Sequence, residues 1–354
     1  MQKGILIVPF MTGYGGTETV IKNLFKSHQK RPNYELKVYS IGGSVDYEWA
    51  KNINIDIKWI SKNRKVRDLY SATVMPFNIF NYLWHEKPDF VISTNPIIWY
   101  LAKLSLRLMH RNTPVIGWYH YSIDQKPIRK IFLNAADYYL SISSGIKKQL
   151  MNKGIPSSKI FLIYNPVVTD EHIIERPKKT HFIYMGRVML DGQKNLRELI
   201  DGLSLVKGNW VLDIYGDESH SDDVKKYAKS KKIAQNIVWH GFINNPWQED
   251  DIEATALLLT SKYEGLPMVL CEGISHGVYC ISADTSTGPE DIINNQNGKL
   301  YSLGNINELA RILQKIVDNQ VLPDQKEIQL TAQIFSPDQY KKRFDNAIKT
   351  ILKK

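Results

Sequence analysis

The sequence predicts an α/β protein built from two doubly wound domains in tandem, and three observations carry this prediction. The chain has 354 residues, which is long for one domain and suits two. Short apolar runs alternate with helical patterns in both halves, as in the βαβ units that form parallel sheets. The alternation stops between residues 165 and 180, where Pro166, Pro177 and scattered charges are typical of a linker.

Each half has its own series of predicted elements. In the first half, strands are predicted at 4–9, 34–41, 88–93, 115–118, 137–142 and 160–164, with a helix over 17–28. In the second half, strands are predicted at 181–185, 210–215, 237–240, 256–260 and 278–282, and helices at 195–206, 222–231, 267–276 and 306–318. An amphipathic helix over 338–352 ends the chain.

These elements give a domain plan. We expect an N-terminal domain over residues 1–165 and a second domain over 166–335. Residues 336–354 should form a helix that packs back on the first domain. In doubly wound domains, ligands bind at the carboxyl ends of the strands, so a ligand cleft is expected between the two domains.

Composition limits the class of protein. Hydrophobic residues make up 43% and charged residues 23% of the chain, as in soluble globular proteins. No run approaches the roughly 20 apolar residues of a membrane span. The N-terminus enters a strand-like run without a basic leader, so a cytoplasmic protein is expected. Cys271 and Cys280 lie in apolar surroundings and are predicted to be core residues.

The charge is uneven along the chain. Residues 1–166 hold 23 Lys and Arg against 10 Asp and Glu, a net charge of +13, whereas the remainder holds 23 against 26. This excess predicts that the first half faces an anionic partner, such as a membrane surface or a phosphorylated substrate. No nucleic-acid-binding motif is present, so nucleic acid is not expected. A Lys-rich surface that only solubilises the protein is the alternative.

The first motif is the Gly-rich turn at residues 13–18, between the first strand and the first helix. Gly15 and Gly16 would let a ligand approach the backbone, and the helix N-terminus offers unpaired N–H groups to a phosphate or sugar oxygen. A purely structural tight turn without a ligand is the alternative.

The second motif is Gly186-Arg187 after the first strand of the second half, with Lys194 at the next helix start. Two cations beside a helix N-terminus can hold a diphosphate and stabilise it as a leaving group. Solvated surface cations are the alternative.

The third motif, residues 264–272, has the sequence EGLPMVLCE and follows an apolar strand. Glu264 is expected in the loop and Glu272 about two turns into the next helix, which Pro267 begins. One carboxylate can bind sugar hydroxyls and the other a ribose, while the N–H groups of residues 268–270 face the phosphates. The alternative is that both carboxylates are solvated. The acidic pairs 222–223 and 250–251 lie in hydrophilic stretches, so no metal site is predicted.

The E-G-x-P-x-x-x-x-E pattern, with Gly-Arg and Lys upstream and Gly-Gly near the N-terminus, resembles the family-4 retaining glycosyltransferases over nearly the whole chain. The resemblance implies the GT-B fold, two Rossmann-like domains facing across a cleft. The runs at 141–144, 164–167 and 214–217 are similar as well. Four shorter runs, at 120–124, 141–147, 257–261 and 286–289, resemble a narrower group, the lipopolysaccharide core α-1,6-galactosyltransferases.

The resemblance implies roles for individual residues. Arg187 and Lys194 would contact the diphosphate of a UDP-sugar and offset the charge on departing UDP. Glu264 would bind hydroxyls of the hexose, Glu272 would bind the ribose, and His120 would lie at the sugar end of the cleft. A hydrogen-bonded histidine among aromatic residues is the alternative for His120. The remaining substrate-binding residues are expected to be Gly15, Gly16, Gly265, Leu266, Met268, Val269, Leu270 and Phe242, the last of them near the uracil.

The implied function is retaining transfer of a hexose from a UDP-sugar to a saccharide acceptor, without metal or cofactor. The catalytic set would be Arg187, Lys194, His120 and Glu264, acting by front-face displacement; a double displacement has only Asp124 as a weak candidate nucleophile. The resemblance favours galactose and lipopolysaccharide core or a related surface glycan, with the enzyme peripheral on the inner face of the membrane. The alternatives are a UDP-sugar epimerase or hydrolase on the same fold, and a non-catalytic nucleotide-sugar-binding protein.

Overall fold

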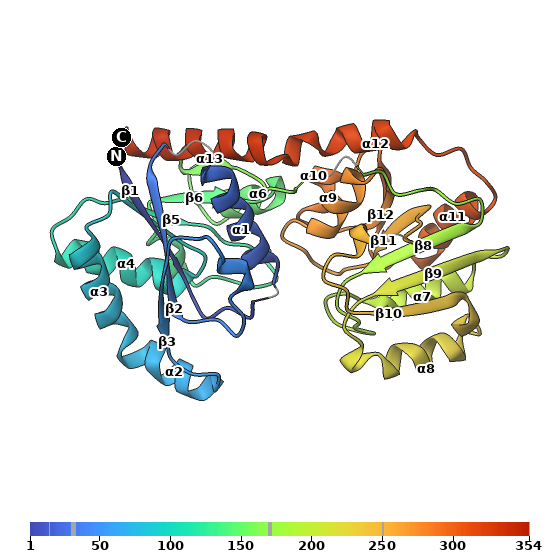
Figure 1. Ribbon diagram of the computed structural model, residues 1–354, viewed down its shortest axis with the longest axis horizontal. Helices are drawn as coiled ribbons and strands as arrows, with labels where there is room; N and C mark the ends of the chain where they lie inside the picture. Colours follow the sequence, from blue (N-terminus) through green and yellow to red (C-terminus); the bar gives the residue numbers. More distant parts are fainter. Residues whose placement is uncertain (14, 30–32, 169–171, 250, 354) are drawn as a thin grey trace. The chain divides into compact units, whose positions relative to one another are not determined.

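The computed structural model describes residues 1–13, 15–29, 33–168, 172–249 and 251–353. It divides into two compact units (Figure 1). Unit 1 is Met1–Pro166 together with Pro337–Lys354, and unit 2 is Val167–Ser336. The predicted linker includes residues 169–171, and the predicted Gly-rich turn and acidic pair include Tyr14 and Asp250, all of which lie outside the described residues.

Unit 1 is built on a seven-stranded parallel sheet in the order β3-β2-β1-β4-β5-β6-β7. The strand order reverses between β1 and β4, which is the switch point where doubly wound domains bind ligands. Residues 5–8 of β1 are fully buried, as expected for a parallel strand covered on both faces. The strands are β1 (Lys3–Val8), β2 (Glu35–Gly42), β3 (Ile55–Trp59), β4 (Phe90–Ser93), β5 (Val115–Gly117), β6 (Tyr138–Ser141) and β7 (Ile160–Leu162).

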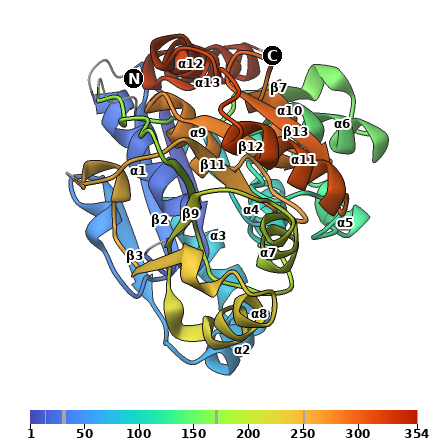
Figure 2. The same ribbon diagram turned by 90° about the vertical axis from the view of Figure 1, so that its right-hand side faces the viewer.

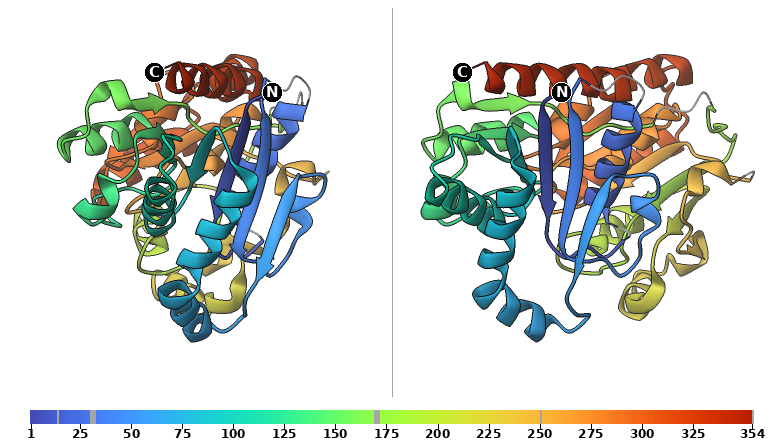
Figure 3. Two further views of the ribbon diagram at one scale, coloured as in Figure 1. Left: turned by 90° about the vertical axis from the view of Figure 1, so that its left-hand side faces the viewer. Right: turned by 60° about the vertical axis from the view of Figure 1, so that its left-hand side comes forward.

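The helices of unit 1 are α1 (Gly16–Gln29), α2 (Arg64–Thr73), α3 (Met75–Glu86), α4 (Pro96–Leu108), α5 (Lys130–Leu133), α6 (Ser144–Asn152) and α13 (Pro337–Leu352). Pro76 lies in the first turn of α3, where its missing N–H costs no hydrogen bond, and α2 ends just before this turn, at Thr73. The C-terminal helix α13 lies beside α1 (Figure 3). Tyr34 Oη donates a 2.9 Å hydrogen bond to Asp345 of α13.

Unit 2 is built on a six-stranded parallel sheet in the order β10-β9-β8-β11-β12-β13, with its switch point between β8 and β11. Helices α7 and α11 pack against each other (Figure 2), so closely that a Cβ on Gly202 would lie 2.7 Å from Leu309 Cδ2. The strands are β8 (Thr180–Met185), β9 (Trp210–Tyr215), β10 (Ile237–Gly241), β11 (Ala256–Leu259), β12 (Tyr279–Asp284) and β13 (Gly298–Ser302). The helices are α7 (Leu196–Ser204), α8 (Asp222–Ser230), α9 (Met268–Ser275), α10 (Pro289–Ile292), α11 (Ile306–Val317) and α12 (Gln325–Thr331).

Short 3₁₀ helices complete the described elements: η1 (Glu48–Ala50), η2 (Ser157–Lys159), η3 (Glu218–His220), η4 (Ala234–Asn236), η5 (Pro246–Gln248) and η6 (Ala332–Phe335). The predicted α/β class, with two doubly wound sheets, is confirmed. Cys271 and Cys280 are fully buried free thiols in the core of unit 2, as expected. Two strands were not predicted, β3 and β13, and both lie at sheet edges.

Candidate active site

The second and third motifs follow the two strands that flank the switch point of unit 2. Arg187 comes after β8, and Glu264 comes after β11. The two strands pair in parallel, with Phe182 opposite Ala256, so their carboxyl ends lie at the same edge of the sheet. The loops that carry Arg187 and Glu264, which are predicted to bind the diphosphate and the hexose, are therefore neighbours.

Lys194 and Glu264 form an ion pair in this place. Lys194 Nζ lies 2.7 Å from Glu264 Oε1, and the two side chains are only 14% and 10% exposed. Thr260, just after β11, donates from its hydroxyl to the carbonyl oxygens of Lys194 and Asn195 at 3.2 and 3.1 Å. The hydroxyl of Thr287 donates to the carbonyl of Glu264. The backbone on both sides of the pair is thus fixed by buried hydroxyls.

Gln193 joins Arg187 to the loop of Glu264. Arg187 Nη2 donates a 2.7 Å hydrogen bond to Gln193 Oε1, and Gln193 Nε2 donates a 3.1 Å bond to the carbonyl of Tyr263. The backbone carbonyl of Gln193 also accepts from the N–H of Lys262 at 2.8 Å. Gln193 was not among the residues predicted from the sequence. Its position directly before Lys194 was a usable signal, because an amide can accept from a cation and donate to a carbonyl at once.

The backbone before Arg187 is set by three strand ends. Gly186 N–H donates to Tyr215 O at 2.9 Å, and Gly216 N–H donates to Gly241 O at 2.8 Å. Gly186 has φ +152°, and a Cβ on Gly216 would lie 2.0 Å from Gly186 O. Only glycine at residue 216 allows the β9 loop to pass this close, so the position of Arg187 depends on β9 as well as β8.

The start of α9 has two N–H groups available to an anion, where three were predicted. The N–H of Leu270 donates to Pro267 O at 3.0 Å, so it is used within the turn. Within the described part of the chain, the N–H groups of Met268 and Val269 have no protein acceptor, as is usual in a first turn. The side chains of Leu266 and Leu270 are 5% and 0% exposed and belong to the core. Any ligand contact from these two residues would have to come from their backbone.

Glu272 is the fifth residue of α9, so it lies just past the first turn and not two turns into the helix as predicted. The side chain is half-buried, and Trp247 Nε1 donates a 3.3 Å hydrogen bond to its Oε2. Burial raises the pKa of Glu272, and the hydrogen bond from Trp247 acts in the opposite direction. Trp247 is itself stacked on His276, with ring centroids 5.0 Å apart. The carboxylate of Glu272 is therefore oriented by a buried indole, and the alternative of a solvated carboxylate is wrong.

In unit 1, the Gly-rich turn is organised by Glu18. Its Oε1 atom accepts from the N–H groups of Thr12 and Gly13, each at 3.0 Å, and the side chain is 5% exposed. A Cβ on Gly15 would lie 2.5 Å from Glu18 Oε2, whereas a Cβ on Gly16 would meet nothing within 4 Å. The tight turn thus explains Gly15, but it gives no steric reason for Gly16.

His120 follows β5 in unit 1, and its ring lies 4.7 Å from that of Trp118. The residue is half-buried, but its Nε2 atom is fully enclosed and has no hydrogen-bond partner among the described residues. Burial lowers the pKa of His120 to about 3, so the imidazole is neutral at neutral pH. In unit 2, Phe242 directly follows β10 and is 64% exposed, which leaves its ring available for stacking.

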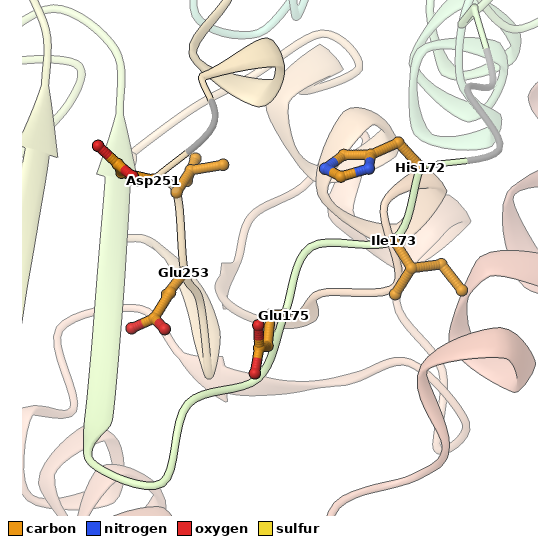
Figure 4. A pocket seen from close by; sticks show the side chains of 6 residues that line it. His172, Ile173, Glu175, Asp251 and Glu253 are labelled. Carbon is orange, nitrogen blue, oxygen red and sulfur yellow. The ribbon is translucent and has the colours of Figure 1, made fainter.

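A separate concavity of about 500 Å³ lies elsewhere in unit 2. Figure 4 shows that its lining comes from two segments, with His172, Ile173 and Glu175 on one and Asp251 and Glu253 on the other. Three carboxylates around it would repel a diphosphate, and none of the predicted site residues line it. It is therefore not the donor site.

Among the described residues, no group of three or more His, Cys, Asp or Glu side chains could hold a metal ion. In the same part of the chain, every helix is too short or too polar to cross a bilayer.

Two family models match the chain in succession. Glycosyltransferase Family 4 matches residues 14–171, and Glycosyl transferases group 1 matches residues 169–333. The chain belongs to the family-4 glycosyltransferases with the GT-B fold.

The relatives of this chain include enzymes whose names state a particular activity. The lipopolysaccharide 1,6-galactosyltransferase of Escherichia coli (strain K12) is 34% identical, over 96% of this chain and 95% of the relative. The enzyme of the same name from Salmonella typhimurium (strain LT2) is also 34% identical, over 97% and 98%. The solved apo structure of the lipopolysaccharide outer core galactosyltransferase WaaB has a TM-score of 0.88 and 33% identity, and covers 99% of each chain. Anabaena HepE, solved in complex with UDP-glucose, has a TM-score of 0.78 at 15% identity, covers 98% of this chain and 99% of HepE, and shares the fold alone.

Proposed function

We propose that this glycosyltransferase moves a hexose, with galactose favoured, from a UDP-sugar to a saccharide acceptor with retention of anomeric configuration. The observation that carries the proposal is the largely buried Lys194–Glu264 pair, held beside Arg187 at adjacent strand ends. The names of the relatives, which are galactosyltransferases, support the choice of sugar, and the UDP-glucose in HepE supports the choice of nucleotide.

In this proposal, the diphosphate is held by fixed charge. Arg187 and Lys194 approach its oxygens, and the N–H groups of Met268 and Val269 add the positive end of the α9 dipole. These groups oppose the negative charge that grows on UDP as the bond to the sugar breaks. No metal ion and no cofactor is required for this step.

The carboxylates orient the donor. Glu264 binds hydroxyls of the hexose once Lys194 has turned to the phosphate, and Glu272, aligned by Trp247, accepts from the ribose hydroxyls. Phe242 would lie near the uracil. The backbone of Gly265, Leu266 and Leu270 lines the rest of the donor site.

The chemical step is a front-face displacement. The bond from the anomeric carbon to the UDP oxygen breaks, the acceptor oxygen bonds to the same face, and a donor phosphate oxygen takes the acceptor's proton. No enzyme base is needed, so the rate depends on orientation and on leaving-group stabilisation. We propose that neutral His120 exchanges a hydrogen bond with the hexose without adding charge. Gly16 would leave room for donor phosphate and acceptor, in a turn that depends on Gly15.

The basic first half suits an anionic acceptor and an anionic surface. We propose that unit 1 holds the acceptor, a saccharide of lipopolysaccharide core or a related surface glycan. The enzyme would act in the cytoplasm, attached peripherally to the inner face of the membrane, and nucleic acid is not a partner. Residues 1–166 carry a net +13, which supports an attachment that weakens as salt rises.

The test is to incubate the full chain with a panel of UDP-hexoses and a truncated lipooligosaccharide, with and without a chelator. NMR of the product gives the anomeric configuration. We expect transfer with retention that survives the chelator, and loss of transfer in Lys194→Ala but not in Lys262→Ala, an exposed cation nearby. An inverted product, or activity abolished by the chelator, contradicts the mechanism. Release of free sugar or epimer with no transfer contradicts the transferase proposal for these substrates.

A further inference from the structure

Helix α2 carries apolar residues but buries none of its residues. Val66 is 45% exposed and Leu69 is 67% exposed, and Phe77 at the start of α3 is 74% exposed. A helix of a soluble domain normally turns such residues toward the core. Apolar residues exposed together usually mark a surface that binds something.

The contacts of α2 define which face is free. The guanidinium of Arg67 lies 3.8 Å from the ring centroid of Phe10, and Tyr70 Oη accepts a hydrogen bond from Asn78. Residues 67 and 70 therefore face unit 1. Lys65 and Val66 lie four and three positions before Leu69, so the three share one exposed side of the helix, with Val66 at its border next to Tyr70. Figures 1 and 3 show α2 at the end of unit 1 away from both chain termini.

The surroundings of this face are strongly basic. Residues 58–67 contain five Lys and Arg and no Asp or Glu. Lys62 and Lys65 are exposed and form no ion pair with any described residue. Arg64 has one partner, Asp68, at 3.8 Å, and both side chains are largely exposed, so this pair neutralises little. We refer to Lys62, Arg64, Lys65, Val66 and Leu69 as the docking face.

We propose that the docking face of α2 is the surface by which the enzyme lies on an anionic membrane. This inference rests on the membrane attachment put forward under Proposed function and assigns it to particular residues. Val66 and Leu69 enter the headgroup region, while the cations around them contact lipid phosphates. This arrangement is that of an interfacial amphipathic helix, with an apolar face bordered by Lys and Arg.

The apolar residues decide between a lipid surface and a phosphorylated sugar as the occupant. A sugar phosphate needs cations and hydrogen-bond donors, and exposed aliphatic side chains add nothing to its binding. Leu69 and Val66 gain free energy only if their occupant removes them from water. Charge and apolar exposure together therefore match a lipid surface.

The experiment measures binding of the full chain to vesicles of phosphatidylcholine alone and to vesicles that also contain phosphatidylglycerol. Three double variants are compared with the wild type. The first is Lys62→Glu with Lys65→Glu, and the second is Val66→Ser with Leu69→Ser. The control is Lys226→Glu with Lys229→Glu on α8 of unit 2, where both lysines are also exposed. All four replaced residues of the docking face are exposed, so the variants should fold, and UDP binding checks this.

We expect the wild type and the α8 control to prefer the anionic vesicles. The charge variant should bind them at least about tenfold more weakly, since each basic residue near the surface contributes on the order of 1 kcal/mol. The serine variant should lose the part of the binding that survives high salt. UDP binding and transfer to a soluble acceptor should be unchanged in every variant.

Three outcomes would overturn the inference in distinguishable ways. Equal wild-type binding to both vesicle types removes the membrane attachment, while the transferase proposal stands on its own assay. Docking-face variants that bind like the wild type leave the attachment but place it elsewhere. Unchanged vesicle binding with reduced transfer to a phosphorylated soluble acceptor makes this face part of the acceptor site.

Discussion

Replacement of Lys194 and Glu264, separately and together, distinguishes a structural ion pair from a catalytic one. The two side chains meet at 2.7 Å and are 14% and 10% exposed. At this distance and an effective dielectric constant of about 20, the Coulomb attraction is roughly 6 kcal/mol before desolvation is subtracted. Desolvation of the two ions offsets most of this attraction, so the net contribution of the pair to stability is small.

Replacement of one partner lowers the stability by more than the small net contribution of the pair suggests. Glu264→Ala leaves the ammonium of Lys194 without its partner, and Lys194→Ala does the same to the carboxylate. Loss of one partner of a buried pair costs about 3–5 kcal/mol, and the residual exposure here lowers the expectation to about 2 kcal/mol. The double variant carries no unpaired charge and should regain at least about 1 kcal/mol relative to the sum of the single variants.

Catalysis should not recover in the same way. If Lys194 stabilises departing UDP and Glu264 binds the hexose, each single replacement lowers kcat/KM at least about tenfold, or about 1.4 kcal/mol of barrier. The double variant then stays at least as slow as the slower single variant, although its stability has recovered. This divergence between stability and rate is the signature of a pair that is broken during turnover.

The assay combines urea unfolding of the four proteins with initial rates of UDP release in the presence of acceptor. Lys262→Ala, a change of an exposed lysine in the same segment, is the matched control for both readouts. If the transfer rate of the double variant recovers along with its stability, the pair is structural and the catalytic assignment is wrong. Wild-type rates in both single variants would remove the residues from the site altogether.

Three further predictions follow from the two units. Gln193→Ala should lower kcat/KM about tenfold with near-wild-type stability, because it frees Arg187 from its 2.7 Å bond. Gln193→Glu should restore the bond to Arg187 but not the one to the Tyr263 carbonyl, since a carboxylate cannot donate, and equal rates in all three proteins would contradict a positioning role. Gly16→Ala should fold normally but transfer the sugar slowly. Gly15→Ala should lower the urea midpoint of unfolding, because the new Cβ would displace the Glu18 carboxylate, 2.5 Å away. The reverse pattern would refute the space assigned to a ligand at residue 16. Burial lowers the pKa of His120 to about 3 in the folded protein. Between pH 6.5 and 3 the imidazole is therefore protonated only in the unfolded chain. The free energy of unfolding falls as the pH drops through this range, by up to about 1.4 kcal/mol per pH unit. His120→Gln should flatten that decline between pH 7 and 5 in urea unfolding, and an unchanged decline would show that this histidine is solvated.

The sheets could be predicted from sequence wherever strands are buried on both faces. The run at residues 5–8 is fully buried in β1, and its apolar character is plain in the sequence. The strands that were missed, β3 and β13, lie at sheet edges, and the last three residues of β3 are exposed. An edge strand is paired on one side only and half solvated, so polar residues alternate with apolar ones, as Asp56 and Lys58 do in β3, and no continuous apolar run marks the strand.

The candidate site, too, could be predicted only in part from the sequence. The charged members of the motifs could be found because a cation after a strand end or a carboxylate in a Gly-Pro loop is unusual at those positions. Gln193 and Trp247 were missed because their role comes from hydrogen bonds to side chains and carbonyls far away in sequence. The depth of Glu272 in α9 was also misjudged. Helix α9 begins at Met268, one residue after the proline that was expected in its first turn.

The chain leaves and re-enters unit 1 at neighbouring points, and this has a practical consequence. Unit 2 is one uninterrupted segment, 167–336, and the N–H of Val167 donates to Phe335 O at 2.9 Å, so its two ends are already joined by a hydrogen bond. A gene fragment for unit 2 therefore needs no splicing, whereas one for unit 1 must reconnect residue 166 to residue 337. Deletion of the last eighteen residues would remove α13, whose side chains Tyr340 and Phe344 are buried in unit 1, and would uncover α1. A C-terminal deletion would therefore damage unit 1, which holds the N-terminus, and spare unit 2.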